Sequence, residues 1–100
     1  MSEMNISEEQ FRIINIIREI RNDNKLSQAG LAHILKISSG AIGNIESTKY
    51  KQKYTLKEIY NVCQEFKIPI EKIFLTEEEL KVGNTKIIEL LIKKIISYEE

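Results

Sequence analysis

The sequence predicts an all-α protein, a bundle of about five helices followed by an additional C-terminal helix. Apolar residues recur every three or four positions along most of the chain, and no segment alternates at a period of two for long enough to form a sheet. Helix-start signals accompany these stripes, with Ser or Thr three residues before Gln or Glu at two of them. The 100 residues, 42% hydrophobic and 30% charged, suit one domain around a single core.

The first three helices follow from their N-cap candidates. Ser7 forms a capping-box pattern with Gln10, and the apolar stripe that follows is Phe11, Ile14, Ile17 and Ile20. Ser27 and Ser38 are expected to cap two short helices, which leaves Ile37 in a tight connection between them. The apolar positions expected to pack between these two helices are Leu31, Leu35, Ile37, Ile42 and Ile45.

The second half of the chain is expected to begin with a basic polar loop over residues 47–54. Thr55, with a Glu three residues later, should open the fourth helix. Pro69 cannot sit inside a helix but can start one, so a short fifth helix is expected over residues 70–74. A last helix is expected over residues 85–98.

Charge is unevenly distributed along the chain, although the formal net charge is zero. Residues 25–58 contain six lysines against two glutamates, and the segments on either side each carry an excess of two acidic residues. A basic middle between acidic flanks can form one positive face, and the local potential decides whether phosphates are attracted.

Two short helices joined by a tight turn, the second beginning with small polar residues, suit the major groove of DNA. The matching residues are Leu26-Ser27-Gln28, Leu31-Ala32, Leu35, Ile37-Ser38, Ile42, Ile45-Glu46, the run from Ile68 to Phe74, and Arg21 seven residues before Gln28. With these residues, the stretch 17–74 resembles the Cro/CI-type (XRE-type) helix-turn-helix family of phage repressors and bacterial regulators. The resemblance implies a five-helix, lambda-repressor-like DNA-binding domain over residues 7–76. Residues 77–100 would form a C-terminal amphipathic helical extension, a candidate dimerisation element.

The resemblance also implies roles for individual residues. The base-contacting positions would be Ser39, Gly40, Ala41, Gly43 and Asn44. The phosphate-contacting positions would be Gln28, Lys49, Lys51 and Lys53. Arg21 and Glu46 would form a partly buried structural ion pair, and Ala32 would be small because the two motif helices cross there.

The expected recognition helix departs from the common family pattern. Only Asn44 can make a bidentate base contact, and this contact suits adenine. The two glycines weaken the helix by about 0.5–1 kcal/mol each relative to alanine, but they let the backbone approach DNA closely. Lys36 and Thr48 stand where relatives often have glycine, and a lysine can adopt a positive φ at a cost of about 1 kcal/mol.

The last helix carries a broad aliphatic stripe, and the sequence does not decide what covers it. It could pack on the domain and complete the core, or it could form a homodimer interface, which we favour because a wide aliphatic face in water is unstable. The positions assigned to the dimer are Ile88, Leu91, Ile92 and Ile95. A third alternative is a different protein partner, such as an antirepressor or a toxin.

Enzymatic and membrane functions have little support in the sequence. His33 and Cys63 are the single histidine and cysteine and lie on different expected helices, so no catalytic group, metal site or cofactor is expected. No apolar run approaches the roughly 18 residues of a membrane span, and a cytoplasmic location is expected. We therefore expect a DNA-binding transcriptional regulator, more specifically a repressor that binds a two-fold operator in double-stranded DNA as a homodimer. The alternative is a protein-interaction module, an antitoxin or adaptor.

Overall fold

The computed structural model describes residues 6–100, and all regular structure in this range is helical. The elements are α1 (Glu8–Asp23), α2 (Gln28–Leu35), α3 (Ser39–Ser47), α4 (Leu56–Phe66), α5 (Glu71–Phe74), the 3₁₀-helix η1 (Glu79–Lys81) and α6 (Asn84–Glu99). The predicted all-α bundle is confirmed. No helix in the described range combines the length and apolar character needed to cross a lipid bilayer.

Side-chain caps begin the first four helices where the sequence predicts them. The hydroxyls of Ser7, Ser27, Ser38 and Thr55 each accept a hydrogen bond from the backbone N–H three residues later. Gln10 and Glu58 return the bond to complete the two predicted capping boxes. Each cap satisfies a backbone donor that the helix cannot pair internally, so these helix starts are encoded locally.

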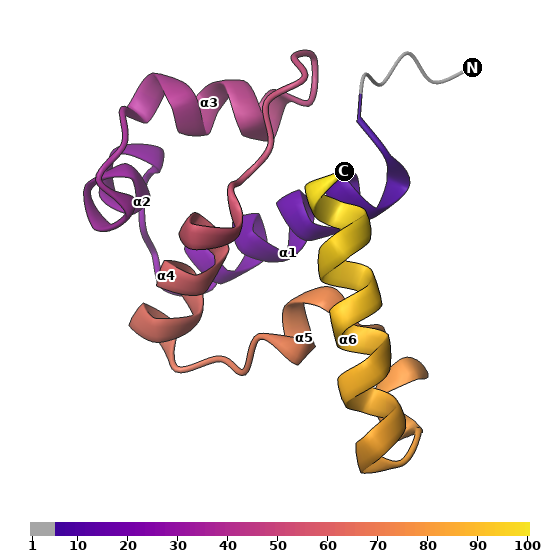
Figure 1. The fold of residues 1–100 in the computed structure, drawn as a ribbon. Helices are drawn as coiled ribbons and strands as arrows, with labels where there is room; N and C mark the ends of the chain where they lie inside the picture. The colour runs from indigo at the N-terminus through magenta and orange to yellow at the C-terminus, as the bar shows by residue number, and fades with distance from the viewer. Residues whose placement is uncertain (1–5) are drawn as a thin grey trace.

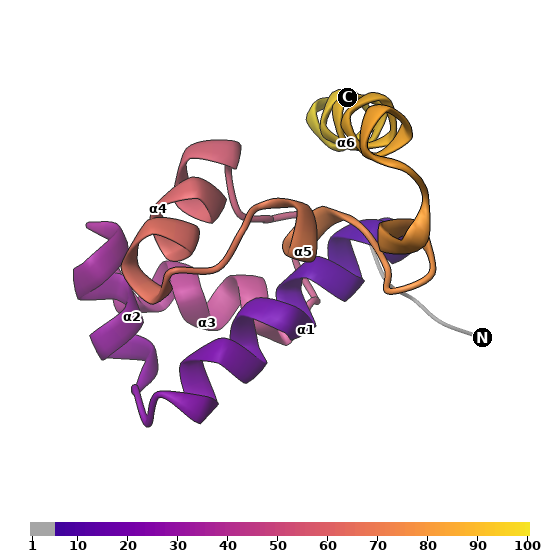
Figure 2. The same cartoon turned by 90° about the horizontal axis from the view of Figure 1, so that it is seen from below.

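The core lies where α1, α2, α3, α4 and α5 meet. Its fully buried side chains include Tyr54, Phe74, Ile13, Ile14, Ile17, Leu31, Ile42, Ile45, Ile59, Ile73 and Val62. The expected stripe of α1 is wrong at one position, because Phe11 is 36% exposed and Ile13 is buried. Figure 1 shows α3 along the top edge of the bundle and α6 down its right side, beside α5. The view from below places α6 beyond α5, far from α2 (Figure 2).

One side of α6 completes the core, which corresponds to the intramolecular alternative for this helix. Tyr98 is 3% exposed, meets Phe74 edge to face at 5.6 Å between ring centroids, and donates a hydrogen bond to the backbone carbonyl of Tyr54. Leu91 and Ile95, two positions assigned to the dimer, pack partly buried against the core because they share this side of the helix. The segment 77–100 is therefore joined to the bundle through its last turns.

The two buried tyrosines differ in how their hydroxyls are satisfied. The Tyr98 hydroxyl has the Tyr54 carbonyl as its acceptor, whereas the Tyr54 hydroxyl has no hydrogen-bond partner among the described residues. Burial raises the pKa of both phenols above the ordinary value of 10.0, so both are neutral near neutral pH. A buried hydroxyl without a partner costs free energy, and one that is paired returns some of it.

Replacement of each tyrosine by phenylalanine should therefore have different effects on stability. Tyr54→Phe should leave the free energy of unfolding unchanged or raise it by up to about 1 kcal/mol. Tyr98→Phe, the matched control, should lower it by about 1 kcal/mol because it removes the bond to the Tyr54 carbonyl. Urea denaturation followed by circular dichroism measures both, and an equal loss in the two variants would contradict this description of the hydroxyls.

Candidate nucleic-acid interface

A turn of three residues, 36–38, joins α2 to α3. Lys36 adopts the left-handed conformation with φ 60°, and the next amide, that of Ile37, donates to the Ala32 carbonyl at 3.0 Å. Ala32, in the middle of α2, is 3% exposed. Thr48 ends α3 in the same conformation, with φ 59°. The chain therefore makes both turns, which often use glycine, with other residues, as expected for Lys36.

The sequence of α3 separates an inner face from an outer face. Ile42, Ile45 and Glu46 are buried against the bundle. The five positions expected to contact bases lie on the other side: Ser39, Gly40 and Asn44 are exposed, and Ala41 and Gly43 are half-buried. Figure 1 shows that no other element covers this outer side of α3. The outer face thus carries small, uncharged side chains and is open to solvent.

The two glycines of this outer face are not required by the fold. A Cβ added at Gly40 would lie 3.9 Å from the nearest atom, the Ser38 hydroxyl oxygen, and one at Gly43 would lie 3.4 Å from the Gln28 side-chain oxygen. Neither glycine has a positive φ. Alanine would therefore fit at both positions and would favour the helix by about 0.5–1 kcal/mol. Packing within the described residues gives no reason for glycine here.

A buried ion pair holds α3 against α1. Arg21 Nε donates to Glu46 Oε2 at 2.8 Å and Arg21 Nη2 to Oε1 at 3.0 Å, so the contact is bidentate. The side chains are 11% and 4% exposed. Arg21 Nη1 also donates to the Leu26 carbonyl, and Gln28 Nε2 donates to Glu46 Oε1 at 3.0 Å. The expected pair is present, and Gln28, assigned to a phosphate, is engaged with it.

This pair changes the electrostatics of the surface around α3. Glu46 is the only acidic residue between Lys25 and Lys57, and Arg21 neutralises it inside the protein. Arg18, which is not among the residues predicted for the site, lies 3.9 Å from the same carboxylate with 53% of its side chain exposed. Its spacing of three from Arg21 on one helix face is the signal that would have found it. The exposed charge of this segment is thus positive.

An open hollow of about 430 Å³ lies where α1, α2 and α3 meet. Its walls are formed by Arg18, Gln28, Gly43, Glu46, Ser47 and Lys49. The hollow brings Arg18 of α1 and Lys49, the second residue after α3, beside the outer face, although they are about thirty residues apart in sequence. Two of its wall residues are cations, and its one acid is paired with Arg21.

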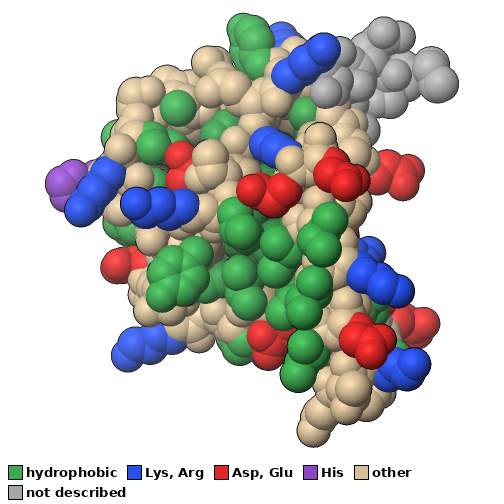
Figure 3. Space-filling model, in the orientation of Figure 1, with side chains coloured by type: hydrophobic (Ala, Val, Ile, Leu, Met, Phe, Trp, Pro, Cys, Tyr) green, Lys and Arg blue, Asp and Glu red, His purple; other side chains and the backbone are tan. Residues whose placement is uncertain are grey.

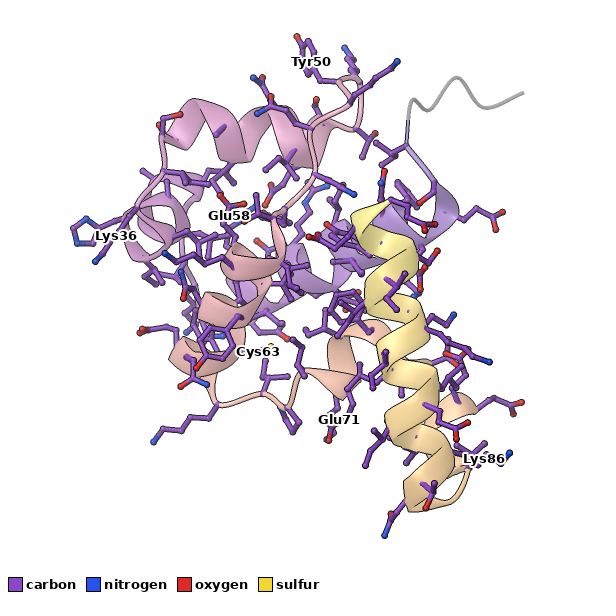
Figure 4. All side chains as sticks on the ribbon, in the orientation of Figure 1. Lys36, Tyr50, Glu58, Cys63, Glu71 and Lys86 are labelled. Carbon is purple, nitrogen blue, oxygen red and sulfur yellow. The ribbon has the colours of Figure 1, made fainter. Side chains whose placement is uncertain are left out.

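The lysines of the loop after α3 do not share one environment. Lys49 and Lys51 are exposed, and Tyr50 projects outward between them with 52% exposure (Figure 4). Lys53 is instead directed into the molecule: its ammonium lies 4.3 Å from the centre of the Tyr98 ring and donates to the Tyr98 carbonyl. The assignment of Lys53 to a phosphate therefore conflicts with its contacts, because the C-terminal helix binds this ammonium.

Other chemically active residues are apart from this surface. Cys63 is buried between helices, and burial together with nearby Glu71 raises the pKa of its thiol (Figure 4). His33 is exposed on α2. Within residues 6–100, no three His, Cys, Asp or Glu side chains gather in a way that could hold a metal ion.

Comparisons of the chain with family models, with curated proteins and with solved structures find no match.

Removal of one partner of the ion pair should destabilise the protein strongly, whereas replacement of both partners by apolar residues should destabilise it little. Glu46→Ala should lower the free energy of unfolding by about 3–5 kcal/mol, because it leaves the Arg21 guanidinium buried without its counter-charge. The double variant Arg21→Met, Glu46→Leu should lose much less, since no charge remains buried. Urea denaturation of Glu46→Ala and of the double variant measures both values. A double variant that loses as much stability as Glu46→Ala would show that the unpaired charge is not the cause of the loss.

Proposed function

We propose that this protein binds double-stranded DNA through the outer face of α3 and acts as a sequence-specific transcriptional regulator, a repressor bound to a two-fold operator as a homodimer. The observation that carries the proposal is the outer face itself. It carries small, uncharged side chains and lies uncovered at the edge of the bundle, with exposed lysines beside it, and Glu46, the one acid between Lys25 and Lys57 in the sequence, is paired internally. A cytoplasmic location accompanies this function.

The geometry of α2 and α3 favours reading of the major groove. A single helix fits this groove and presents the side chains of its N-terminal part to base edges. Ser39 and Ala41 can contact base edges or thymine methyl groups, and Asn44 can bind adenine through two hydrogen bonds. Gly40 and Gly43 reduce helix stability without a packing reason, and close approach of the backbone to DNA would supply that reason.

Phosphate contacts would surround this face. Lys49 and Lys51 follow α3, Arg18 approaches from α1, and the free N–H groups at the start of α2 favour an anion. Each cation that neutralises a phosphate adds about 0.9 to the salt dependence of binding. Arg18, Lys49 and Lys51 are therefore the cations that would meet the backbone of DNA.

A protein-interaction module, such as an antitoxin or adaptor, is the second candidate. Exposed isoleucines on α6 favour it, because they offer an apolar surface on a helix other than α3. Selection of bound duplexes from a random DNA library at about 150 mM salt separates the two candidates. Enrichment of a motif with two-fold symmetry supports the regulator. A folded protein that enriches no DNA motif supports the interaction module.

Gly40→Ala offers a sharp test of close backbone approach. The substitution should raise the free energy of unfolding by about 0.5–1 kcal/mol, because alanine favours the helix and fits the space. The same methyl group should weaken binding to the selected duplex by at least about 10-fold. Thermal denaturation and a fluorescence titration measure the two effects. A variant that is more stable and binds DNA equally well would exclude backbone approach at this position.

Base and phosphate contacts should respond differently to substitution. Asn44→Ala should reduce the preference for the selected site by about 1–3 kcal/mol. Lys51→Ala should weaken binding to all duplexes equally and reduce the slope of log K against log salt concentration by about one. Lys72→Ala is the control, since this exposed lysine lies on α5, away from α3. Titrations at several salt concentrations measure these effects, and an unchanged preference in Asn44→Ala would refute the assigned base contact.

A further inference from the structure

The outward side of α6 carries an apolar stripe that the bundle does not cover. Ile88, Ile92 and Ile96 are 61%, 52% and 54% exposed, although isoleucine is usually buried. They are four residues apart, so they form one line along the helix, named here the outer stripe. Figure 3 shows hydrophobic side chains gathered over α6 and the neighbouring part of the bundle. Such a continuous patch marks an interaction surface.

We propose that the outer stripe packs against the outer stripe of a second copy of this chain, with the two α6 helices antiparallel and a two-fold axis near Ile92. In that arrangement Ile88 of one copy meets Ile96 of the other, and Ile92 meets its own equivalent. The pairing rests on the proposed function, which places two copies on a two-fold operator, but its test needs no DNA. An isologous interface requires a self-complementary surface.

The charges beside the outer stripe supply this self-complementarity. At 3.6 residues per turn, one flank of the stripe carries, in chain order, Lys86, Glu89, Lys93 and Glu100. The other flank carries the side chains that pack on the core, Leu91, Ile95 and Tyr98. A shallow hollow bounded by Lys86, Glu89 and Lys93 places these three on one side of α6, and Figure 4 shows Lys86 on the side away from α5.

Antiparallel pairing brings each of these acids to a base. Around an axis at Ile92, Glu89 faces Lys93 of the second copy and Lys86 faces Glu100 of the second copy, so four pairs of opposite charge line the interface. In a parallel pair the charged flank of one helix would meet the apolar flank of the other, and no such pairs form. The order of charges along α6 therefore selects a second copy in antiparallel orientation.

Sedimentation equilibrium of the full chain without DNA tests the proposal. The wild-type protein should be a dimer at about 50 μM, and Ile92→Glu should raise the dissociation constant more than about 100-fold, because it buries two unpaired carboxylates. Tyr50→Glu is the matched control, because Tyr50 is also 52% exposed but lies in the loop after α3. A monomeric wild type, or an Ile92→Glu variant that remains dimeric, would overturn the proposal. Circular dichroism verifies that each variant is folded.

A charge swap tests the antiparallel orientation separately. Glu89→Lys and Lys93→Glu should each weaken the homodimer about 3–10-fold, because each places like charges across the interface. An equimolar mixture of the two variants should recover wild-type affinity as a heterodimer, since every facing pair is again opposite. Homodimers unaffected by either swap would overturn the antiparallel pairing. Failure of the DNA selection with a dimer present would reject only the proposed function.

Discussion

The position of α3 depends on the bidentate contact between Arg21 and Glu46. This helix has nine residues, two of them glycine, so it is too short and too weak to be stable alone. Arg21 belongs to the long helix α1 and also binds the Leu26 carbonyl just before α2, while Gln28 of α2 joins the same carboxylate. One ion pair thus orients both helices of the motif. Removal of either partner would leave a buried charge and release α3 from its support.

The same contact has an electrostatic effect on the surface. A carboxylate exposed beside α3 would repel an anion, but Glu46 lies inside the protein with its charge matched by Arg21. The pairing with Arg21 therefore gives Glu46 both its structural and its electrostatic role. It permits a chain with as many acids as bases to present a local surface on which cations dominate.

Interactions between residues close in sequence made much of the fold predictable, whereas contacts between residues far apart in sequence could not be predicted. The caps at Ser27 and Ser38 and both capping boxes depend on residues three positions apart, so the sequence is sufficient to find them. The contact of Lys53 with Tyr98 joins residues 45 positions apart, and no sequence pattern indicates it. The side of α6 that packs inward could likewise not be chosen from its stripe, because Leu91 and Ile92 are equally apolar. Only the position of the bundle decides which one is covered.

Glycine is distributed in this chain in reverse of its usual use. The non-glycine residues with positive φ in the described range are Lys25, Lys36, Thr48 and Lys67, and no described glycine has a positive φ. A side chain in that conformation costs about 1–2 kcal/mol, so the turns store strain while glycines weaken α3. Natural proteins need only exceed a stability threshold. Relief of the strain at these turns by substitution should therefore raise the thermal stability of the fold, with no change to the residues of α3 or α6.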